Sequence, residues 1–371
     1  MVDSASDIMK KSVAVVSNMN ADIGDTNGDV LDVGVSFDGS WHTRGHKSKY
    51  GFGAVIEIVT GQVLDYEVLC NYCQNCTTKE RELGGSDTEA FKEWHSSHTA
   101  QCTINFKGTA NAMEVEAAKR IWSRSIAKNS MRYTSMLGDG DSKAHKAVQD
   151  LKPYGDIEVN REECVNHAHK RMGTALRNAA KEQKLGGKGH GRLTVAKCQK
   201  LQNYYRGAII NNIGNEEGMR NAIWATLMHS MSTDDDPQHQ YCPSGETSWC
   251  FYQRAEARNK EPPSHALNMN TTIAADVAKC LTPIYQRMSD PNLVKRLSKG
   301  KTQNPNEALH NVVWSRCPKT IFVGRQRIEA AAARGVAAFN AGLYDEATFN
   351  ITPPLNRQNE RLYRAIANSD I

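Results

Sequence analysis

The chain has 371 residues, of which 39% are hydrophobic and 23% are charged, and its formal net charge is +5. These fractions are typical of a globular protein, and no apolar run approaches the roughly 18 residues that a membrane-spanning helix needs. The N-terminus has no basic segment followed by an apolar one, so we see no secretory signal and expect an intracellular protein. Because the first predicted strand follows so soon, we expect the core of a longer protein.

The beginning of the chain predicts a helical lead-in followed by three strands. The lead-in covers 1–29. Apolar and β-branched residues between turn signals predict strands at 30–41, 51–60 and 63–69. Within the first of these strands, Asp38 directly follows an apolar run.

Residues 70–104 are rich in cysteine and histidine and show little periodicity, which indicates a segment ordered by a metal ion. His95 is one candidate ligand, but its spacing is less regular than that of its neighbours. A cluster of reduced cysteines without metal is the competing interpretation. The spacing typical of a tetrahedral zinc site is found in Cys73-x2-Cys76 together with His98-x3-Cys102.

The next elements complete the predicted sheet. Apolar residues at helical spacing predict a helix at 112–128. A strand that ends at Asp139, a short helix at 142–151 and a strand near 156–159 follow it.

The remaining chain is mostly helical in pattern. A glycine-rich stretch at 186–191 interrupts the region 165–288. It lacks the Lys-Ser/Thr ending of a phosphate-binding loop, so we interpret it as a flexible connection. A helix that contains Glu307 and an alanine-rich helix at 327–341 come next, and the tail after Pro353 is polar.

This order of strands and helices describes an RNase H-like fold, an α/β architecture with a mixed sheet and helices on both faces. Asp139 and Glu307 are farther apart than that fold requires, so most of the chain between them is expected to form a helical insertion. The expected parts are the N-terminal helical lead-in (1–29), the first part of the core (30–69), a zinc-knuckle insertion (70–104), the second part of the core (105–170), a large, mostly helical insertion domain (171–300), the C-terminal core helices (301–345) and a polar tail (346–371).

Three carboxylates are the candidate catalytic residues: Asp38, Asp139 and Glu307. Two aspartates that follow strand-like runs and a distant helical glutamate can converge on two divalent ions. Mg²⁺ prefers oxygen ligands, and a pair of such ions can cut phosphodiester bonds.

Each of these acids also has a purely structural interpretation. Asp38 and Asp139 both precede a glycine and suit the start of a turn, with Asp141 capping the next helix. The pattern from Asn304 to Glu307 resembles a capping box, with asparagine at the N-cap, proline at the first helical position and glutamate at the third.

The segment 165–207 has ten lysines and arginines but one acidic residue, Glu182. Such a local excess favours a polyanion. A solvated helix face is the alternative. The candidate nucleic-acid contacts are Lys170, Arg171, Lys181, Lys184, Lys188 and Arg192.

A second metal site is indicated in the helical region. Cys164-x2-His167 and His239-x2-Cys242, with Cys250, can share one zinc ion. A local alternative uses His229, His239, Cys242 and Cys250. The tryptophans of this region, Trp224 and Trp249, could stack on an unpaired base, although core positions are the more common use.

These residues together resemble the catalytic region of Mutator-like transposases. The segments that carry the resemblance are 33–41 with 44–46, 137–143, 163–173 and 301–307. The resemblance implies a DDE catalytic core in which the acids fall on Asp38, Asp139 and Glu307. It also places a Cys-x2-His motif of the family on Cys164 and His167. All of these positions are intact, which argues against a decayed copy.

We therefore expect the core of a cut-and-paste DNA transposase that uses two Mg²⁺ or Mn²⁺ ions and one or two structural zinc ions. Its expected partner is double-stranded DNA, at the element ends and the target. We expect it in the nucleus, away from membranes, as a homodimer or larger assembly on DNA. The alternatives are a domesticated zinc-bearing DNA-binding protein without catalysis and an RNase H-like nuclease without strand transfer.

Overall fold

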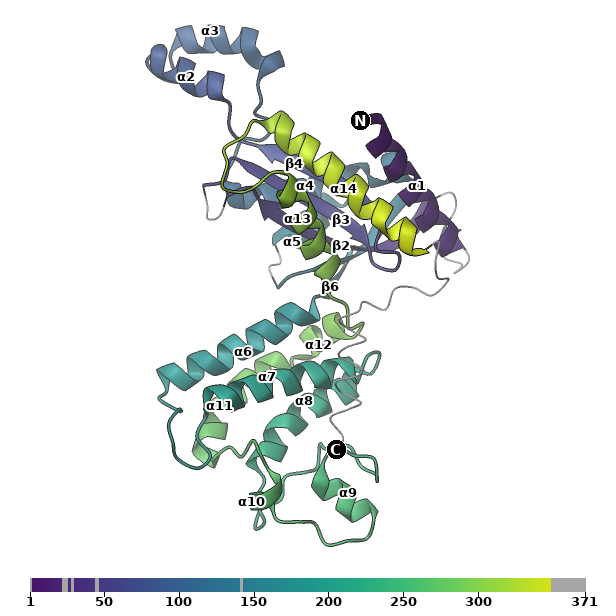
Figure 1. Ribbon diagram of the computed structural model, residues 1–371, viewed down its shortest axis with the longest axis vertical. Helices are drawn as coiled ribbons and strands as arrows, with labels where there is room; N and C mark the ends of the chain where they lie inside the picture. Colours follow the sequence, from purple (N-terminus) through teal and green to yellow (C-terminus); the bar gives the residue numbers. More distant parts are fainter. Residues whose placement is uncertain (1, 22–25, 28–29, 44–46, 141–142, 348–371) are drawn as a thin grey trace. The chain divides into compact units, whose positions relative to one another are not determined.

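The computed structural model describes residues 2–21, 26–27, 30–43, 47–140 and 143–347. The chain forms two compact units (Figure 1). Unit 1 comprises Met1–Met136, Asp141–Asn160 and Gln303–Ile371, and unit 2 comprises Leu137–Gly140 and Arg161–Thr302. Within the described ranges, no helix is long and apolar enough to cross a membrane. The predicted turn or cap at Asp141, the segment 44–46 and the tail from residue 348 lie outside the described residues.

A mixed sheet is the centre of the α/β fold. Its order is β4-β3-β2-β5-β6, with β1 paired to β2. The strands within the described residues are β1 (Thr26–Asn27), β2 (Val30–Trp41), β3 (Tyr50–Glu57), β4 (Val63–Cys70), β5 (Met131–Gly138) and β6 (Asn160–Glu163).

Strands β2, β3 and β4 form an antiparallel meander in which Asp38 pairs with Ala54 and Gly53 with Glu67. Strand β2 has the predicted bounds. Strand β3 ends three residues earlier than predicted, because the Glu57 carboxylate accepts hydrogen bonds from the N–H groups of Val59 and Thr60 and turns the chain there.

Strand β6 begins later than the sequence predicts. The predicted strand at 156–159 follows a turn in which Lys152 and Gly155 adopt left-handed backbone angles, with φ of 48° and 66°. Turn hydrogen bonds run from Gly155 to Lys152 and from Ile157 to Tyr154. These turns delay the extended pairing until residue 160.

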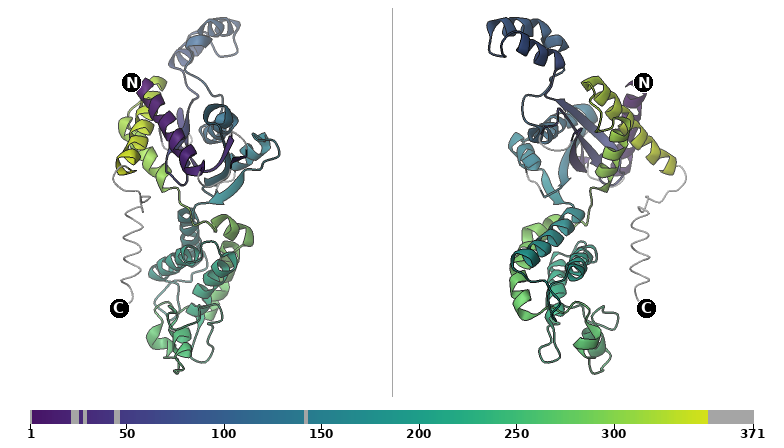
Figure 2. Two further views of the ribbon diagram at one scale, coloured as in Figure 1. Left: turned by 90° about the vertical axis from the view of Figure 1, so that its right-hand side faces the viewer. Right: turned by 60° about the vertical axis from the view of Figure 1, so that its left-hand side comes forward.

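Helices cover both faces of the sheet (Figure 2). On one face, α4 (Ala110–Asn129) and α5 (Lys143–Leu151) share a core with Val33, Val35 and Phe37 of β2. On the other, α13 (Asn304–Arg316) and α14 (Arg325–Ala347) pack on alternate residues of β3, and α1 (Val2–Ala21) packs beside α14. All eight residues of β3 are buried, as expected for a strand covered on both sides.

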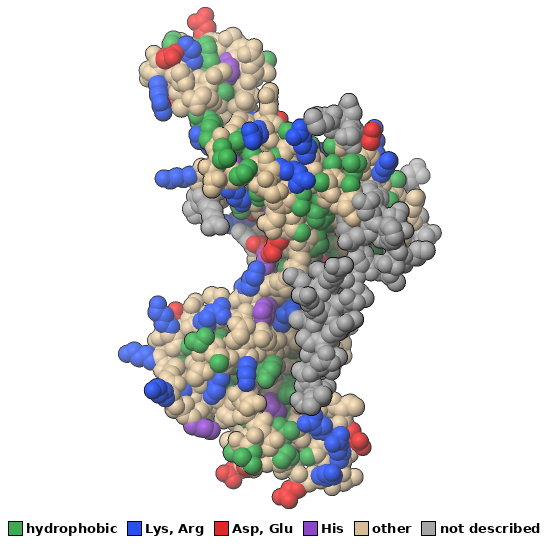
Figure 3. All heavy atoms as spheres, in the orientation of Figure 1, with side chains coloured by type: hydrophobic (Ala, Val, Ile, Leu, Met, Phe, Trp, Pro, Cys, Tyr) green, Lys and Arg blue, Asp and Glu red, His purple; other side chains and the backbone are tan. Residues whose placement is uncertain are grey.

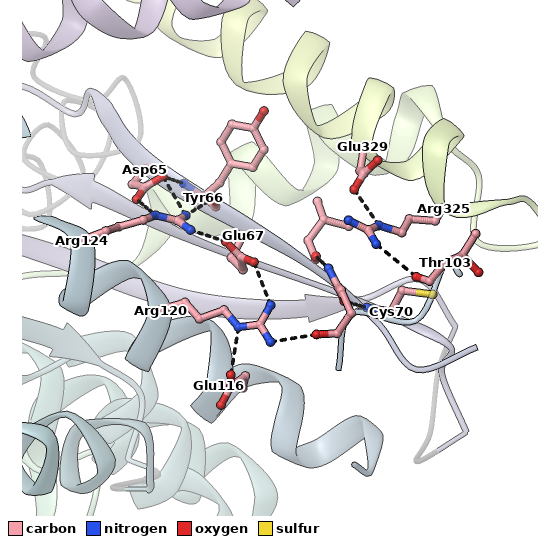
Figure 4. Close-up of polar contacts among 12 residues, drawn as sticks. Asp65, Tyr66, Glu67, Cys70, Thr103, Glu116, Arg120, Arg124, Arg325 and Glu329 are labelled. Carbon is pink, nitrogen blue, oxygen red and sulfur yellow. Dashed lines mark hydrogen bonds and ion pairs between the residues drawn. The ribbon is translucent and has the colours of Figure 1, made fainter. Parts of the chain in front are cut away.

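Ion pairs between charged side chains join α4 to β4 (Figure 4). The carboxylate of Asp65 is fully buried and accepts from Arg124 Nε at 2.7 Å and from Lys128 Nζ at 2.5 Å. Glu67 binds Arg120 and Arg124. Because Asp65 is fully buried, removing the cations that pair with it would leave a desolvated charge on β4.

The segment between β4 and α4 is helical, in contrast to its weak sequence periodicity. It contains α2 (Gln74–Glu82), α3 (Glu89–His98) and the 3₁₀ turn η1 (Thr99–Gln101). Its own buried apolar cluster consists of Cys73, Cys76 and Phe91. So small a core supplies little hydrophobic stabilisation.

Unit 2 is helical, as the pattern predicts. Its core joins apolar residues of long helices such as Met172, Leu201, Ile223 and Leu281. The glycine-rich stretch 186–191 is an irregular connection between the first two helices. The helices are α6 (Val165–Glu182), α7 (Val195–Ile210), α8 (Glu216–Met231), α9 (Phe251–Ala257), α10 (His265–Asn268), α11 (Ala275–Met288) and α12 (Pro291–Leu297).

Candidate active site and metal-binding groups

Asp38 lies within β2, and its side chain is held from two sides. Its Oδ1 accepts a hydrogen bond from the N–H of Gly39 at 3.0 Å. Its Oδ2 lies 3.6 Å from Nδ1 of His310 in α13. The side chain is 25% exposed, so solvent reaches a carboxylate whose orientation is restricted.

The first turn of α13 is hydrogen-bonded to the part of β2 just before Asp38. The Gln303 side chain donates to the backbone O of Phe37 at 2.8 Å. Asn306 is fully buried, and its Oδ1 accepts from the hydroxyl of Ser36 at 2.5 Å. Glu307 is exposed and belongs to the same first turn. It is therefore within one helical turn of Gln303 and Asn306, the residues that contact β2.

The capping-box interpretation of Glu307 is wrong. Helix α13 begins at Asn304, so Gln303 is the N-cap residue and Glu307 occupies the fourth helical position. The N-cap side chain makes no capping hydrogen bond. Asn304 is therefore not the N-cap residue that a capping box with Glu307 at the third position requires.

His310 was not identified from the sequence, because a histidine in a helix has no pattern that reveals its neighbour in space. Burial, and then the charge of Lys319, lower the pKa of His310 to about 4. Its imidazole is therefore neutral at neutral pH. The Nε2 atom is buried and makes no hydrogen bond to the described residues.

Asp139 directly follows β5, which is the neighbour of β2 in the sheet. The N–H of Leu31 in β2 donates to the O of Ser130 just before β5. Farther along both strands, a Cβ at Gly34 would lie 3.7 Å from the Cβ of Ser135. The contacts advance in the same direction along both strands, so β2 and β5 run parallel.

The four residues predicted to bind zinc between β4 and α4 are together. Their donor atoms all lie within 4.8 Å of one another. The Sγ of Cys73 is 3.3 Å from Nε2 of His98, and the Sγ atoms of Cys76 and Cys102 are 3.6 Å apart. His95 is stacked on Phe91 instead. This knuckle group, Cys73, Cys76, His98 and Cys102, could hold a metal ion.

Backbone groups favour the thiolate form of Cys73. Burial opposes ionisation, but hydrogen bonds from the backbone at Thr103 and Cys76 and from the side chains of His98 and Thr103 together lower the pKa of Cys73 to about 5. A thiolate is the form that binds metal.

A second group of donors lies in unit 2. It consists of His229, His239, Cys242 and Cys250, whose donor atoms also lie within 4.8 Å of one another. Nδ1 of His239 is 3.2 Å from Nδ1 of His229 and 3.4 Å from Sγ of Cys250. This helical-unit group could hold a second ion.

Cys164 and His167 are not among the donors that the structure brings together with His239, Cys242 and Cys250. Among the residues that the structure describes, these two belong to neither group of donors. Cys164 is the N-cap residue of α6, and its backbone O accepts from His167. Ten residues separate His229 from His239, so spacing alone did not distinguish the local ligand set from the shared one.

The candidate DNA-contacting residues divide into two kinds. Lys170, Lys181, Lys184 and Lys188 are exposed on α6 and in the loop that follows it. Figure 3 shows lysine and arginine side chains over unit 2. The two candidate arginines, Arg171 and Arg192, differ from these lysines because they form ion pairs within the protein.

Arg171 pairs with Glu163, whose side chain is fully buried and also binds Arg296 at 3.1 Å. Arg192 pairs with Asp276 at 3.2 Å. The tryptophans of this unit differ as well. Trp224 packs on the helical core, and Trp249 is 53% exposed beside His229.

The structure is that of an α/β protein with Asp38 on β2 and Asp139 directly after the neighbouring strand β5. Glu307 lies on a helix that is hydrogen-bonded to β2, and two Cys/His groups could hold metal ions. A family model described as Mutator-like transposase matches residues 1–250. This match covers more than half of the chain, so the chain belongs to the Mutator-like transposase family. Searches of curated proteins and of solved structures gave no match.

Proposed function

We propose that this chain is the catalytic core of a cut-and-paste DNA transposase with an RNase H-like fold. Asp38, Asp139 and Glu307 would hold two Mg²⁺ or Mn²⁺ ions. The observation that carries the proposal is the attachment of α13 to β2. Gln303, four positions before Glu307, donates to the backbone O of Phe37, the residue before Asp38. His310, three positions after Glu307, lies beside Asp38 itself.

The strand arrangement supports a place for Asp139 in this set. Asp38 lies on β2, and Asp139 directly follows β5, the strand next to β2 in the sheet order. All three acids offer hard oxygen donors, as Mg²⁺ requires. The matched part of the chain includes both aspartates and ends before Glu307.

Two such ions, when bound, make a nucleophile available near neutral pH and stabilise the charge that develops in phosphodiester cleavage. The chain's own groups hold the arrangement in place. Gly39 restrains one oxygen of Asp38, and the buried Ser36–Asn306 pair prevents α13 from sliding along β2. A neutral His310 beside Asp38 adds no positive charge that would compete with a cation.

Both Cys/His groups fit zinc. Tetrahedral bond lengths of about 2.3 Å to sulfur and about 2.0 Å to nitrogen place neighbouring donors about 3.3–3.8 Å apart. The separations of 3.3 Å for Cys73–His98, 3.6 Å for Cys76–Cys102 and 3.2 Å for His229–His239 lie close to this range. We therefore propose two structural zinc sites, one in each group.

Family membership supports a DNA substrate. We propose that the exposed lysines of unit 2 contact DNA phosphates, that the protein acts in the nucleus, and that it assembles as a homodimer or larger oligomer on double-stranded DNA. We further propose that the zinc-knuckle segment and unit 2 are insertions in the RNase H-like core.

Cleavage and strand transfer test the proposal directly. The chain would be incubated with DNA that carries the terminal repeats flanking its own gene, in Mg²⁺ or Mn²⁺. We expect cuts at the repeat ends and joining of the freed 3′-hydroxyl to target DNA. Cleavage without joining would favour a plain nuclease, and metal-independent binding without cleavage would favour a domesticated DNA-binding protein.

A further inference from the structure

Two residues outside the helical-unit group form a continuous hydrogen-bonded chain with one of its ligands. Nε2 of His239 lies 2.9 Å from Nε2 of His265, the first residue of α10. Nδ1 of His265 lies 2.6 Å from Oδ1 of Asp234. The same carboxylate oxygen accepts from the backbone N–H of His265 at 2.7 Å.

The acceptor at the end of the chain fixes the direction of its hydrogen bonds. The carboxylate of Asp234 can only accept, so Nδ1 of His265 donates to it. In a neutral His265, Nε2 then accepts from the Nε2–H of His239. This leaves the lone pair of His239 on Nδ1, the atom that faces the other donors of the group.

Other contacts hold the chain in this orientation. The ring of Tyr252 stacks on His239, with centroids 4.3 Å apart and an interplanar angle of 18°. Asp234 also accepts from the hydroxyl of Ser264 at 2.8 Å. His239 and His265 are buried, whereas Asp234 is exposed, so the chain runs from the candidate metal site to the surface.

We propose that His265 and Asp234 are positioning residues for a zinc ion held by His229, His239, Cys242 and Cys250. His265 selects the tautomer of His239 that presents Nδ1 to the ion, and Asp234 selects the matching tautomer of His265. Hydrogen-bonded partners of this kind orient metal ligands and raise their basicity. The inference rests on the proposed zinc at this group.

Zinc release from the purified full chain tests it. A colorimetric chelator would be added, and the release of the two zinc ions would be assigned with Cys76→Ser and Cys242→Ser. We expect His265→Leu to speed release from the helical-unit group by about 10- to 100-fold, as for other such partners, and to leave the knuckle group unchanged. We expect zinc release from His265→Gln to be slower than from His265→Leu, since the amide oxygen of glutamine can accept from His239.

Asp234→Ala keeps the test decisive if the buried His265 variant does not fold, because Asp234 is exposed and alanine removes the acceptor of Nδ1 of His265. We expect a smaller acceleration of the same release. Asp235→Ala removes a carboxylate one residue away and is the matched control. Unchanged release in Asp234→Ala would overturn the inference, as would unchanged release in a folded His265→Leu protein. A parent protein with zinc in the knuckle group alone would instead overturn the proposed zinc site and this inference with it.

Discussion

The two units hold their candidate functional residues in different ways. In unit 1, Asp38 and Glu307 depend on buried hydrogen bonds between residues about 270 positions apart in sequence, such as Ser36 and Asn306. In unit 2, the candidate DNA-contacting lysines are exposed along α6 and the loop after it. Metal ligands require exact placement, whereas attraction of phosphate groups requires only local charge density.

One candidate metal site of unit 1, in the knuckle segment between β4 and α4, does not rest on a large buried core. The knuckle segment has a very small apolar core and no long helix, whereas the sheet beside it is covered on both faces. Where a core is so small, the free energy of metal binding is also free energy of folding. Four variants test this comparison, and we describe them from the largest expected effect to the smallest.

Glu307→Gln should have the largest effect. It removes the charge of one proposed metal ligand and keeps its size, so cleavage should fall on the order of 10³-fold or more, as expected of groups that act as a unit. The unfolding temperature should not change. Glu217→Gln is the matched control, because Glu217 also lies in the first turn of a helix. Normal cleavage by the Glu307 variant would refute its role as a ligand.

Cys76→Ser tests the knuckle segment of unit 1. The protein should lose one equivalent of zinc, and the amides of α2 and α3 should exchange freely with solvent. The strands of the sheet should keep their protection, because their core does not include this segment. Metal analysis and hydrogen exchange measure the two effects. Cys280→Ser, which changes a cysteine outside both groups, should alter neither.

Asn306→Ala tests the buried hydrogen bond between α13 and β2. The buried hydroxyl of Ser36 would lose its partner, which should lower the free energy of unfolding by about 2–3 kcal/mol. Asn311→Ala changes an exposed asparagine of the same helix and should cost less than about 0.5 kcal/mol. Chemical denaturation measures both. Equal effects of the two substitutions would mean that the Ser36–Asn306 hydrogen bond contributes nothing specific to the free energy of unfolding.

The smallest effect is expected for the triple variant Lys181→Glu, Lys184→Glu and Lys188→Glu. DNA affinity should fall across all sequences, and its dependence on salt should weaken by about one unit of slope per lost phosphate contact. The matched control replaces Lys260, Lys279 and Lys295 of the same unit with glutamate, an equal change of charge. Binding titrations at several salt concentrations would show whether the two triple variants differ. Equal affinities would make the stretch an ordinary solvated face.

Local patterns were sufficient to predict much of this protein. Strand β2 has the predicted bounds, and the ligand spacing from Cys73 to Cys102 identified four donors that lie together. The resemblance to Mutator-like transposases is confirmed by the family match. These features depend on residues close in sequence, where periodicity and spacing reflect the structure directly.

Contacts between distant residues were decided by the tertiary structure alone. It brought His229 together with His239, Cys242 and Cys250 in the second donor group. It also placed His310 against Asp38 and His265 against His239. No periodicity encodes such pairs, because each partner is chosen by how separate helices and strands pack, and packing joins residues that are unrelated in sequence.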